Sequence, residues 1–289
     1  MATPTFEKKV FFDFEGKPSS VNVRFFGPRR QGTLLALHGL ATQGYCFDNL
    51  AMLVREPLIA IDWYGYGDSD RRLSKDDTYS AQICADWLLA ATRALQDHGM
   101  LTRDFDVLAM SMSALPVALD YEKLSIRKIV FIHPAGLDTK INRKLSFGLS
   151  SGILSDTVLK IVTLPIVWRL LWKWSTIRSS DERRRYIRSD VVEQKGEFEV
   201  LRRYSKSGFD SWGHMRSTHY IPEHFKKINC PVLLLYGNDT VFYKRKYVEF
   251  GIHAGWKIVF IESAPHNMVR SHAEQIAGPI NDFLGKNMI

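Results

Sequence analysis

Residues 107–119, VLAMSMSALPVAL, give the clearest indication of how this chain folds. The stretch begins with an apolar run typical of a buried strand, reaches Ser111 within four residues, and continues as a helical pattern. Ala109 and Ser113 stand two residues to either side of Ser111. In a sharp strand-to-helix turn the central residue has a strained backbone, and only small side chains fit at those flanking positions. The stretch therefore predicts a turn that lifts the Ser111 hydroxyl above the end of a strand.

A hydroxyl in this position suits a nucleophile. The helix that follows Ser111 directs the N–H groups of its first turn toward the hydroxyl, where they stabilise an oxyanion that develops during acyl transfer. The simpler alternative is that Ser111 only caps the helix. Small residues two positions before and after a serine occur often by chance. The position of Ser111 between a buried strand and a helix nevertheless favours its role as a nucleophile.

The rest of the chain alternates short apolar runs with helical patterns. Runs that are apolar almost throughout are typical of strands buried on both faces of a parallel sheet. The predicted strands are 9–14, 21–26, 33–37, 58–61, 105–109, 128–133, 232–236 and 257–261. The predicted helices are 45–54, 80–98, 113–122, 243–253 and 272–284. This order predicts an α/β fold, with an opening hairpin, a mostly parallel open sheet and helices on both faces.

Residues 138–227 interrupt this rhythm, because about 90 residues pass without a clear strand. We interpret them as a helical cap inserted between two strands of the sheet, which leaves 1–137 and 228–289 as the core domain. Within the cap, residues 158–174 are strongly apolar. The simpler interpretation is a helix packed on the core; the alternatives are a wall for an acyl chain or a helix at a membrane surface.

Charge is concentrated in the same segment. The chain has 39 basic and 31 acidic residues, a net charge of +8, and 138–227 contains 18 of the basic but only 10 of the acidic ones. A positive surface there would attract an acidic acyl carrier protein, the phosphates of coenzyme A or an anionic membrane surface, unless the charges serve only solubility. No nucleic-acid-binding module is recognisable, so we expect no nucleic-acid partner.

Composition excludes several other classes of protein. With 289 residues, 45% apolar and 24% charged, the chain is neither disordered nor collagen-like nor a coiled coil. Its three cysteines are too few and too scattered for a disulfide framework or a zinc cluster. No phosphate-binding glycine loop or dinucleotide fingerprint is present, so we expect no cofactor and no metal. The absence of a secretory or membrane-spanning pattern predicts a cytoplasmic protein, with peripheral membrane attachment as an alternative.

With these features the chain resembles the α/β-hydrolase superfamily over residues 10–287, with the cap as the divergent part. Four further segments carry the resemblance: a strand with a His-Gly oxyanion loop, an Asp-x-x-Gly-x-Gly-x-Ser segment, a penultimate strand with an acid loop, and a last strand with a histidine loop. They are residues 34–44, 58–70, 230–239 and 261–269. The resemblance implies the α/β-hydrolase fold.

The resemblance also implies a catalytic triad of Ser111, Asp239 and His266, which follow one another in the family's chain order. His266 would take the proton of the serine hydroxyl, and Asp239 would orient the imidazole. The family more often places two residues between the glycine of the acid loop and the aspartate, whereas this chain has one. Asp138, soon after the preceding strand, is therefore kept as the alternative acid.

Further roles follow from the same resemblance. The backbone N–H groups of Leu40 and Met112 would form the oxyanion hole. His38 and Asp62 would support the loops that they begin rather than transfer protons. Trp168, in the apolar part of the cap, is a candidate for the wall of a substrate pocket, together with Trp172.

Serine at the nucleophile position indicates acyl transfer, because relatives that open epoxides or displace halides have aspartate there. We therefore expect a serine hydrolase that cleaves a hydrophobic carboxylic ester through an acyl-enzyme intermediate. The first alternative is a thioesterase that releases acyl chains from coenzyme A or an acyl carrier protein. The second is a non-catalytic ligand receptor on the same fold, since the fold alone does not determine the chemistry.

Overall fold

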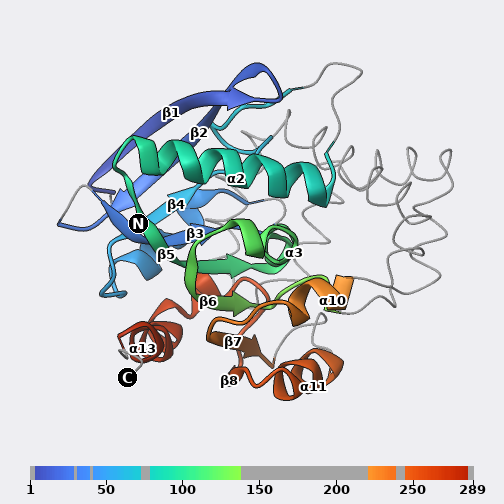
Figure 1. Ribbon diagram of the computed structural model, residues 1–289. Coiled ribbons are helices and arrows are strands. Elements are labelled where there is room, and N and C mark those ends of the chain that lie inside the picture. The colour runs from blue at the N-terminus through green and yellow to red at the C-terminus, as the bar shows by residue number, and fades with distance from the viewer. Residues whose placement is uncertain are drawn as a thin grey trace, which may run out of the picture.

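The computed structural model describes residues 4–28, 31–39, 42–72, 79–137, 221–238 and 245–285. Eight strands in these ranges form one sheet, in the order β1-β2-β4-β3-β5-β6-β7-β8 (Figure 1). The strands are β1 (Phe6–Phe14), β2 (Lys17–Phe26), β3 (Gly32–Leu37), β4 (Leu58–Ile61), β5 (Leu101–Met110), β6 (Ile126–Ile132), β7 (Val232–Gly237) and β8 (Lys257–Ile261). The described α-helices are α1 (Asp48–Ala51), α2 (Ala81–Asp97), α3 (Ala114–Leu119), α10 (Ile221–Lys226), α11 (Arg245–His253), α12 (Met268–Ser271) and α13 (Ala273–Leu284).

The sheet is mostly parallel, as the sequence predicted. β1 pairs with β2 and β2 pairs with β4 in antiparallel fashion, whereas all the remaining neighbours are parallel. The carboxyl ends of β3, β5, β6, β7 and β8 therefore lie along one edge of the sheet, where sites in open α/β sheets usually form.

Helices cover both faces of the sheet, because successive residues of each strand point to opposite sides. On β3, Leu35 and Leu37 belong to the core that packs against α2 and α3, whereas Leu34 and Ala36 belong to the core under α1, α12 and α13. Figure 1 shows α2 and α3 on one side of the sheet and α13 on the other. The predicted α/β class and the two covered faces are thus confirmed.

Some predicted helices are divided in the structure. Residues 45–54 form a 3₁₀ turn, Gly44–Phe47, followed by the single-turn helix α1. Residues 113–122 are divided between the end of a 3₁₀ turn, Ser111–Ser113, the helix α3, and a further 3₁₀ turn, Tyr121–Lys123. The pattern predicted α2 more closely, because the Ser80 hydroxyl accepts a hydrogen bond from the Ile83 N–H and caps the helix.

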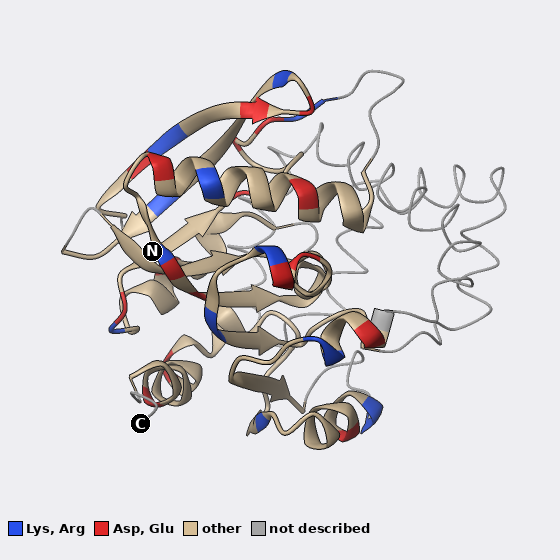
Figure 2. Cartoon of the chain, in the orientation of Figure 1, with Lys and Arg blue, Asp and Glu red and all other residues tan. Residues whose placement is uncertain are grey.

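Helix α10 comes from the end of the segment interpreted as the cap. Its Phe225 is fully buried and packs against Phe131 of β6 and Trp256, with ring centroids 5.7 and 6.4 Å away. Residues 138–220 lie outside the described residues, so the cap and its boundaries stay a prediction. Over the described strands and helices, acidic and basic residues are interspersed (Figure 2), and outside 138–227 the chain holds as many acidic as basic residues.

The turn after β4 is organised by a buried carboxylate. Asp62 accepts hydrogen bonds from the Gly44 N–H at 2.7 Å, the Asn22 side-chain amide at 2.9 Å and the Asp68 N–H at 3.1 Å. Gly67 has a left-handed φ of 52°, and a Cβ at this position would overlap the Asp62 carboxylate. The carboxylate therefore requires glycine there, which agrees with the structural role inferred for Asp62.

We predict that Gly67→Ala lowers the free energy of unfolding by about 3–4 kcal/mol, because it adds left-handed strain and disrupts a buried hydrogen-bonded carboxylate. Gly99→Ala is the matched control, since Gly99 has a φ of 63° and open space around its Cβ position. It should cost only about 1 kcal/mol. Urea unfolding of the two variants measures the difference, and equal losses would contradict the role of Asp62.

Candidate active site

Ser111 lies in the sharp turn that the sequence predicted. It follows β5 directly, begins a 3₁₀ turn of three residues that leads into α3, and has a left-handed φ of 55°. A non-glycine residue in this region is strained by about 1–3 kcal/mol, so the surroundings must hold it there. One such contact is the hydrogen bond from the Ala135 N–H, after β6, to the Ser111 carbonyl at 2.9 Å.

The residues that flank Ser111 are fully buried. Ala109 and Ser113 have no exposed surface. The Ser113 hydroxyl lies 2.7 Å from the Met110 carbonyl and 2.9 Å from the Leu37 carbonyl, either of which accepts its proton. A serine therefore fits where the family usually has glycine, because its polar atom has backbone partners in the core.

His266 faces the serine. It lies in the loop between β8 and α12, and its Nε2 is 3.0 Å from the Ser111 Oγ. Burial lowers the pKa of His266 from 6.5 to about 4, because the charged imidazole loses its hydration. The ring is therefore neutral near pH 7, and its Nε2 has the lone pair that a general base needs.

The loop after β3 approaches Ser111 from the other side. A Cβ on Gly39 would lie 3.1 Å from the Ser111 Cβ and 3.7 Å from its Oγ, so the chain passes close to the hydroxyl here. Met112 follows Ser111 and is buried. Leu40, the other predicted contributor to an oxyanion hole, lies outside the described residues, so the hole stays a prediction.

His38 holds this loop rather than facing the serine. Its Nε2 accepts the Trp63 N–H at 2.9 Å, which leaves the ring proton on Nδ1, where it is donated to the Gly39 carbonyl at 2.7 Å. Burial lowers the pKa of His38 to about 4. The ring is thus a neutral bridge between two loops, in agreement with the supporting role inferred from the sequence.

Several predicted site residues fall outside the described ranges. They are Asp239 and the alternative acid Asp138, and the cap residues Trp168 and Trp172. Their assignments stay predictions. Nearby residues are described: Gly237 ends β7, and Asn238 follows it and accepts the Ser263 N–H at 2.7 Å through its side-chain oxygen.

His133 was not predicted as a site residue, and the structure places it beside His266. The strand expected to include His133 ends one residue earlier, at Ile132. The His133 ring centroid lies 5.1 Å from that of His266 and 5.0 Å from that of Tyr236. The available signal was a histidine directly after a buried strand, the same placement that His38 has after β3.

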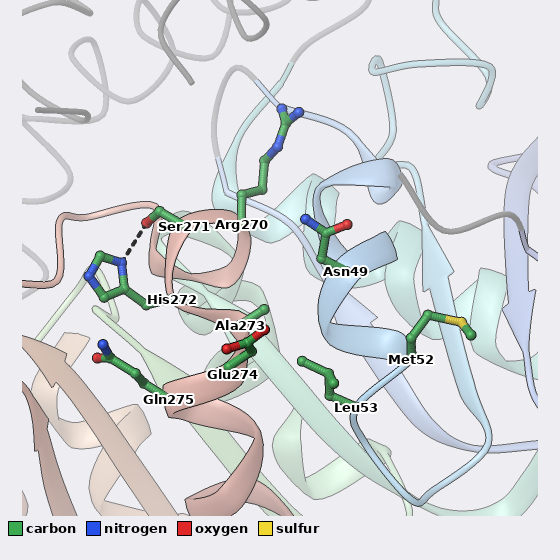
Figure 3. Close-up of a pocket in the computed structure, with 9 residues that line it drawn as sticks. All are labelled: Asn49, Met52, Leu53, Arg270, Ser271, His272, Ala273, Glu274 and Gln275. Atoms are coloured by element: carbon green, nitrogen blue, oxygen red, sulfur yellow. Dashed lines mark hydrogen bonds between the residues drawn. The ribbon is translucent and has the colours of Figure 1, made fainter. Parts of the chain in front are cut away.

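A pocket of about 460 Å³ lies elsewhere, between α1 and the start of α13 (Figure 3). Neither Ser111 nor His266 lines it. It contains a second Ser–His contact, since the Ser271 hydroxyl is 2.8 Å from the His272 Nδ1. Its lining residues are Asn49, Met52, Leu53, Arg270, Ser271, His272, Ala273, Glu274 and Gln275.

A metal cluster and a membrane-spanning helix are both absent from the described part of the chain. Within these ranges, no group of three or more His, Cys, Asp or Glu side chains is placed to hold a metal ion. None of the described helices has the length and apolar character required to cross a membrane.

Known proteins share this architecture. A model of the alpha/beta hydrolase family matches residues 34–278. A thermophilic esterase from Thermogutta terrifontis has a TM-score of 0.74 at 13% identity, covering 97% of this chain and 98% of its own. The haloalkane dehalogenase DbeA from Bradyrhizobium elkani has 0.71 at 18% identity, covering 97% and 98%. A thioesterase domain from the curacin biosynthetic pathway has 0.60 at 15% identity, covering 96% and 99%.

At these identities the solved structures are evidence of a shared fold alone. A search of curated protein sequences found no match.

The lowered pKa values of His38 and His266 predict a loss of stability in acid. Between pH 6.5 and about 4 the unfolded chain binds protons at His38 and His266 that the folded chain does not, so stability falls as the pH falls through this window. Each histidine contributes a slope of about 1.4 kcal/mol per pH unit. In His266→Ala, the free energy of unfolding, measured with urea between pH 4.5 and 6, should depend on pH less steeply than in the parent by that amount. An unchanged slope in His266→Ala would contradict the neutral state of the folded imidazole.

Proposed function

We propose a hydrolytic function for this chain, because it belongs to the alpha/beta hydrolase family, whose model matches residues 34–278. More finely, we propose a serine hydrolase that cleaves a hydrophobic carboxylic ester through an acyl-enzyme intermediate. The contact of 3.0 Å between the Ser111 Oγ and the His266 Nε2 supports this proposal most directly, because it joins a hydroxyl on a strained turn to a neutral, half-buried base.

The proposed reaction begins at this contact. His266 accepts the hydroxyl proton at Nε2 while the Ser111 Oγ attacks the ester carbonyl carbon. The resulting oxyanion is stabilised by the backbone N–H groups of Leu40 and Met112. His266 then passes the proton to the departing alkoxide, which leaves as the alcohol and gives the acyl-enzyme. A water molecule, deprotonated by His266, attacks the acyl-enzyme, and the acid leaves as Ser111 regains its proton.

The nucleophile favours acyl transfer over the other chemistries of this fold. A serine ester formed as an intermediate is hydrolysed by water at its carbonyl carbon, whereas attack by serine on an alkyl halide or epoxide would leave an ether that water does not cleave readily. The proposed substrate therefore carries an acyl group. The apolar part of the predicted cap, with Trp168 and Trp172, supports a hydrophobic acyl chain.

The second candidate is a thioesterase that acts on an acyl group bound to coenzyme A or a carrier protein. The observation that favours it is the charge of residues 138–227, which contain 18 basic and 10 acidic residues. A positive surface there would attract the phosphates of coenzyme A or an acidic carrier protein, and also an anionic membrane surface. In the non-catalytic alternative, the same fold would bind a ligand without turning it over.

We predict that Ser111→Ala lowers turnover at least ~10³-fold, because the covalent route is lost. Turnover is measured on p-nitrophenyl esters and acyl-coenzyme A thioesters of matched chain length, so the same panel separates ester from thioester hydrolysis. Ser271→Ala is the matched control, since Ser271 also contacts a histidine but lines the pocket between α1 and α13, away from Ser111. It should keep parent turnover.

Labelling of the same proteins with a fluorophosphonate probe distinguishes an enzyme from a receptor. The parent and Ser271→Ala should be labelled, and Ser111→Ala should not. Labelling of Ser111→Ala at the parent level, or no labelling of the parent, would overturn the assignment of Ser111 as the nucleophile.

We also predict that Asp239→Asn lowers turnover by up to ~10⁴-fold, because the amide favours the wrong tautomer of His266. It should also lower the midpoint of the acid limb of kcat/KM, since a carboxylate next to a buried imidazole raises its pKa. Asp138→Asn is the matched variant for the alternative acid and should be mild on both measures. The reverse pattern would move the acid to Asp138.

A further inference from the structure

His133 occupies an unusual backbone position at the edge of the candidate site. It follows β6 directly, donates its N–H to the Leu235 carbonyl at 3.2 Å and has a left-handed φ of 46°. Two residues later, the Ala135 N–H holds the Ser111 carbonyl. A non-glycine residue is uncommon in this region of φ, so its side chain must be held there by the surrounding structure.

The tautomer of His133 follows from its contacts. The Gly237 N–H donates to Nε2 at 3.0 Å, so this nitrogen has no proton and the neutral ring carries its proton on Nδ1. Protonation at Nε2 would break the bond to Gly237. Burial, together with the nearby His266, lowers the pKa of His133 well below its ordinary value.

Nδ1 of His133 has no hydrogen-bond partner among the described contacts, although the residue is only 4% exposed. A buried N–H without an acceptor is destabilising, and such groups in native structures usually have a reason other than stability. An apolar ring at this position would avoid that penalty, but it would leave the Gly237 N–H without its acceptor. The imidazole therefore differs from an apolar ring of similar size in its contact at Nε2.

The ring of His133 joins the elements that carry the candidate site. It contacts His266 at 5.1 Å between centroids, with the ring planes inclined by 50°, and Tyr236 edge-on at 5.0 Å. Those two are the titratable side chains that pack against it within the described residues. Its bonding partner Gly237 is packed so closely on the loop before His266 that a Cβ there would overlap the Ala264 carbonyl.

We propose that His133 is a positioning residue for His266: its ring holds the imidazole in the orientation that faces Ser111, and its bond to the Gly237 N–H fixes the end of β7 against the histidine loop. The inference rests on the proposed function. Nε2 of His133 already accepts the Gly237 N–H, so it has no free lone pair for a proton. Of the two contacting rings, His266 is therefore the one that is protonated during the reaction.

Two substitutions separate the contributions of the ring and of its nitrogen. His133→Asn keeps an acceptor oxygen and tolerates the left-handed backbone, but it removes the ring from His266. His133→Phe keeps a ring of similar size and removes the acceptor. We expect His133→Asn to lower kcat about tenfold with KM within about twofold of the parent, because the base is misplaced rather than the substrate lost.

The pH dependence provides a readout that a merely structural role would not move. In His133→Asn the midpoint of the acid limb of kcat/KM should rise by about one unit, because water reaches the His266 imidazolium and relieves its desolvation. In His133→Phe it should stay within about 0.3 unit of the parent, since the ring still excludes water.

Phe131→Leu is the matched control for lost core packing in β6. Phe131 is fully buried two residues before His133 and packs against Phe225 and Trp256. The Phe131→Leu substitution should lower the melting temperature and leave the midpoint of the acid limb of kcat/KM at the parent value. A shift of the acid limb in Phe131→Leu equal to that in His133→Asn would overturn the inference.

NMR of ¹³C-histidine-labelled protein tests the pair without relying on turnover. The His266 ring signal, assigned by its loss in His266→Ala, is titrated in the Ser111→Ala background with and without each His133 substitution. His133→Asn should raise the His266 midpoint and His133→Phe should not. Unchanged midpoints with unchanged kcat overturn the role of His133 while leaving the proposed function intact. The opposite result is a His266 midpoint that shifts in His133→Asn while the parent protein shows neither turnover nor probe labelling. It would overturn the proposed function and leave the contact between the two rings intact.

Discussion

The candidate site depends on the left-handed backbone at Ser111. A φ of 55° at this residue is unfavourable by itself, and it persists because the flanking residues are small, buried and bonded to their surroundings. The Ser113 hydroxyl is satisfied by strand carbonyls, and the Ala135 N–H holds the Ser111 carbonyl. With the backbone held in this way, the Ser111 hydroxyl stands at the carboxyl edge of the sheet, within reach of His266.

Three histidines gather at that edge, His38 and His133 buried and His266 half-buried, and their contacts separate their roles. His38 and His133 each accept a backbone N–H at Nε2, from Trp63 and Gly237 respectively, which commits that nitrogen and keeps the ring neutral. His266 directs its Nε2 to a hydroxyl instead. All three residues are histidines at the same edge of the sheet, so residue type and position do not identify the base. The partner of Nε2 identifies it, because only His266 faces a hydroxyl among the three.

The sequence predicted the sheet well because buried strands are apolar almost throughout. Runs 58–61 and 257–261 match β4 and β8 at both ends. The family resemblance implied the pairing of Ser111 with His266, and the Ser111 Oγ lies 3.0 Å from the His266 Nε2. The helix predicted at 45–54 is instead a 3₁₀ turn followed by a single-turn α-helix. Apolar spacing over so few residues does not distinguish a 3₁₀ turn from an α-helix. The contact of His133 with His266 joins loops 133 residues apart and leaves no local pattern.

The burial of His266 places a requirement on the rest of the site. A ring whose pKa is lowered to about 4 is a weak base, yet the proposed reaction protonates it in each half-cycle. A carboxylate next to the ring would offset the cost of that charge. The end of β7 is fastened to the histidine loop, because the Ser263 N–H bonds to the Asn238 side chain and Gly237 packs on Ala264. Asp239 follows Asn238 directly in the sequence, so this attachment favours the loop after β7 as the source of the acid.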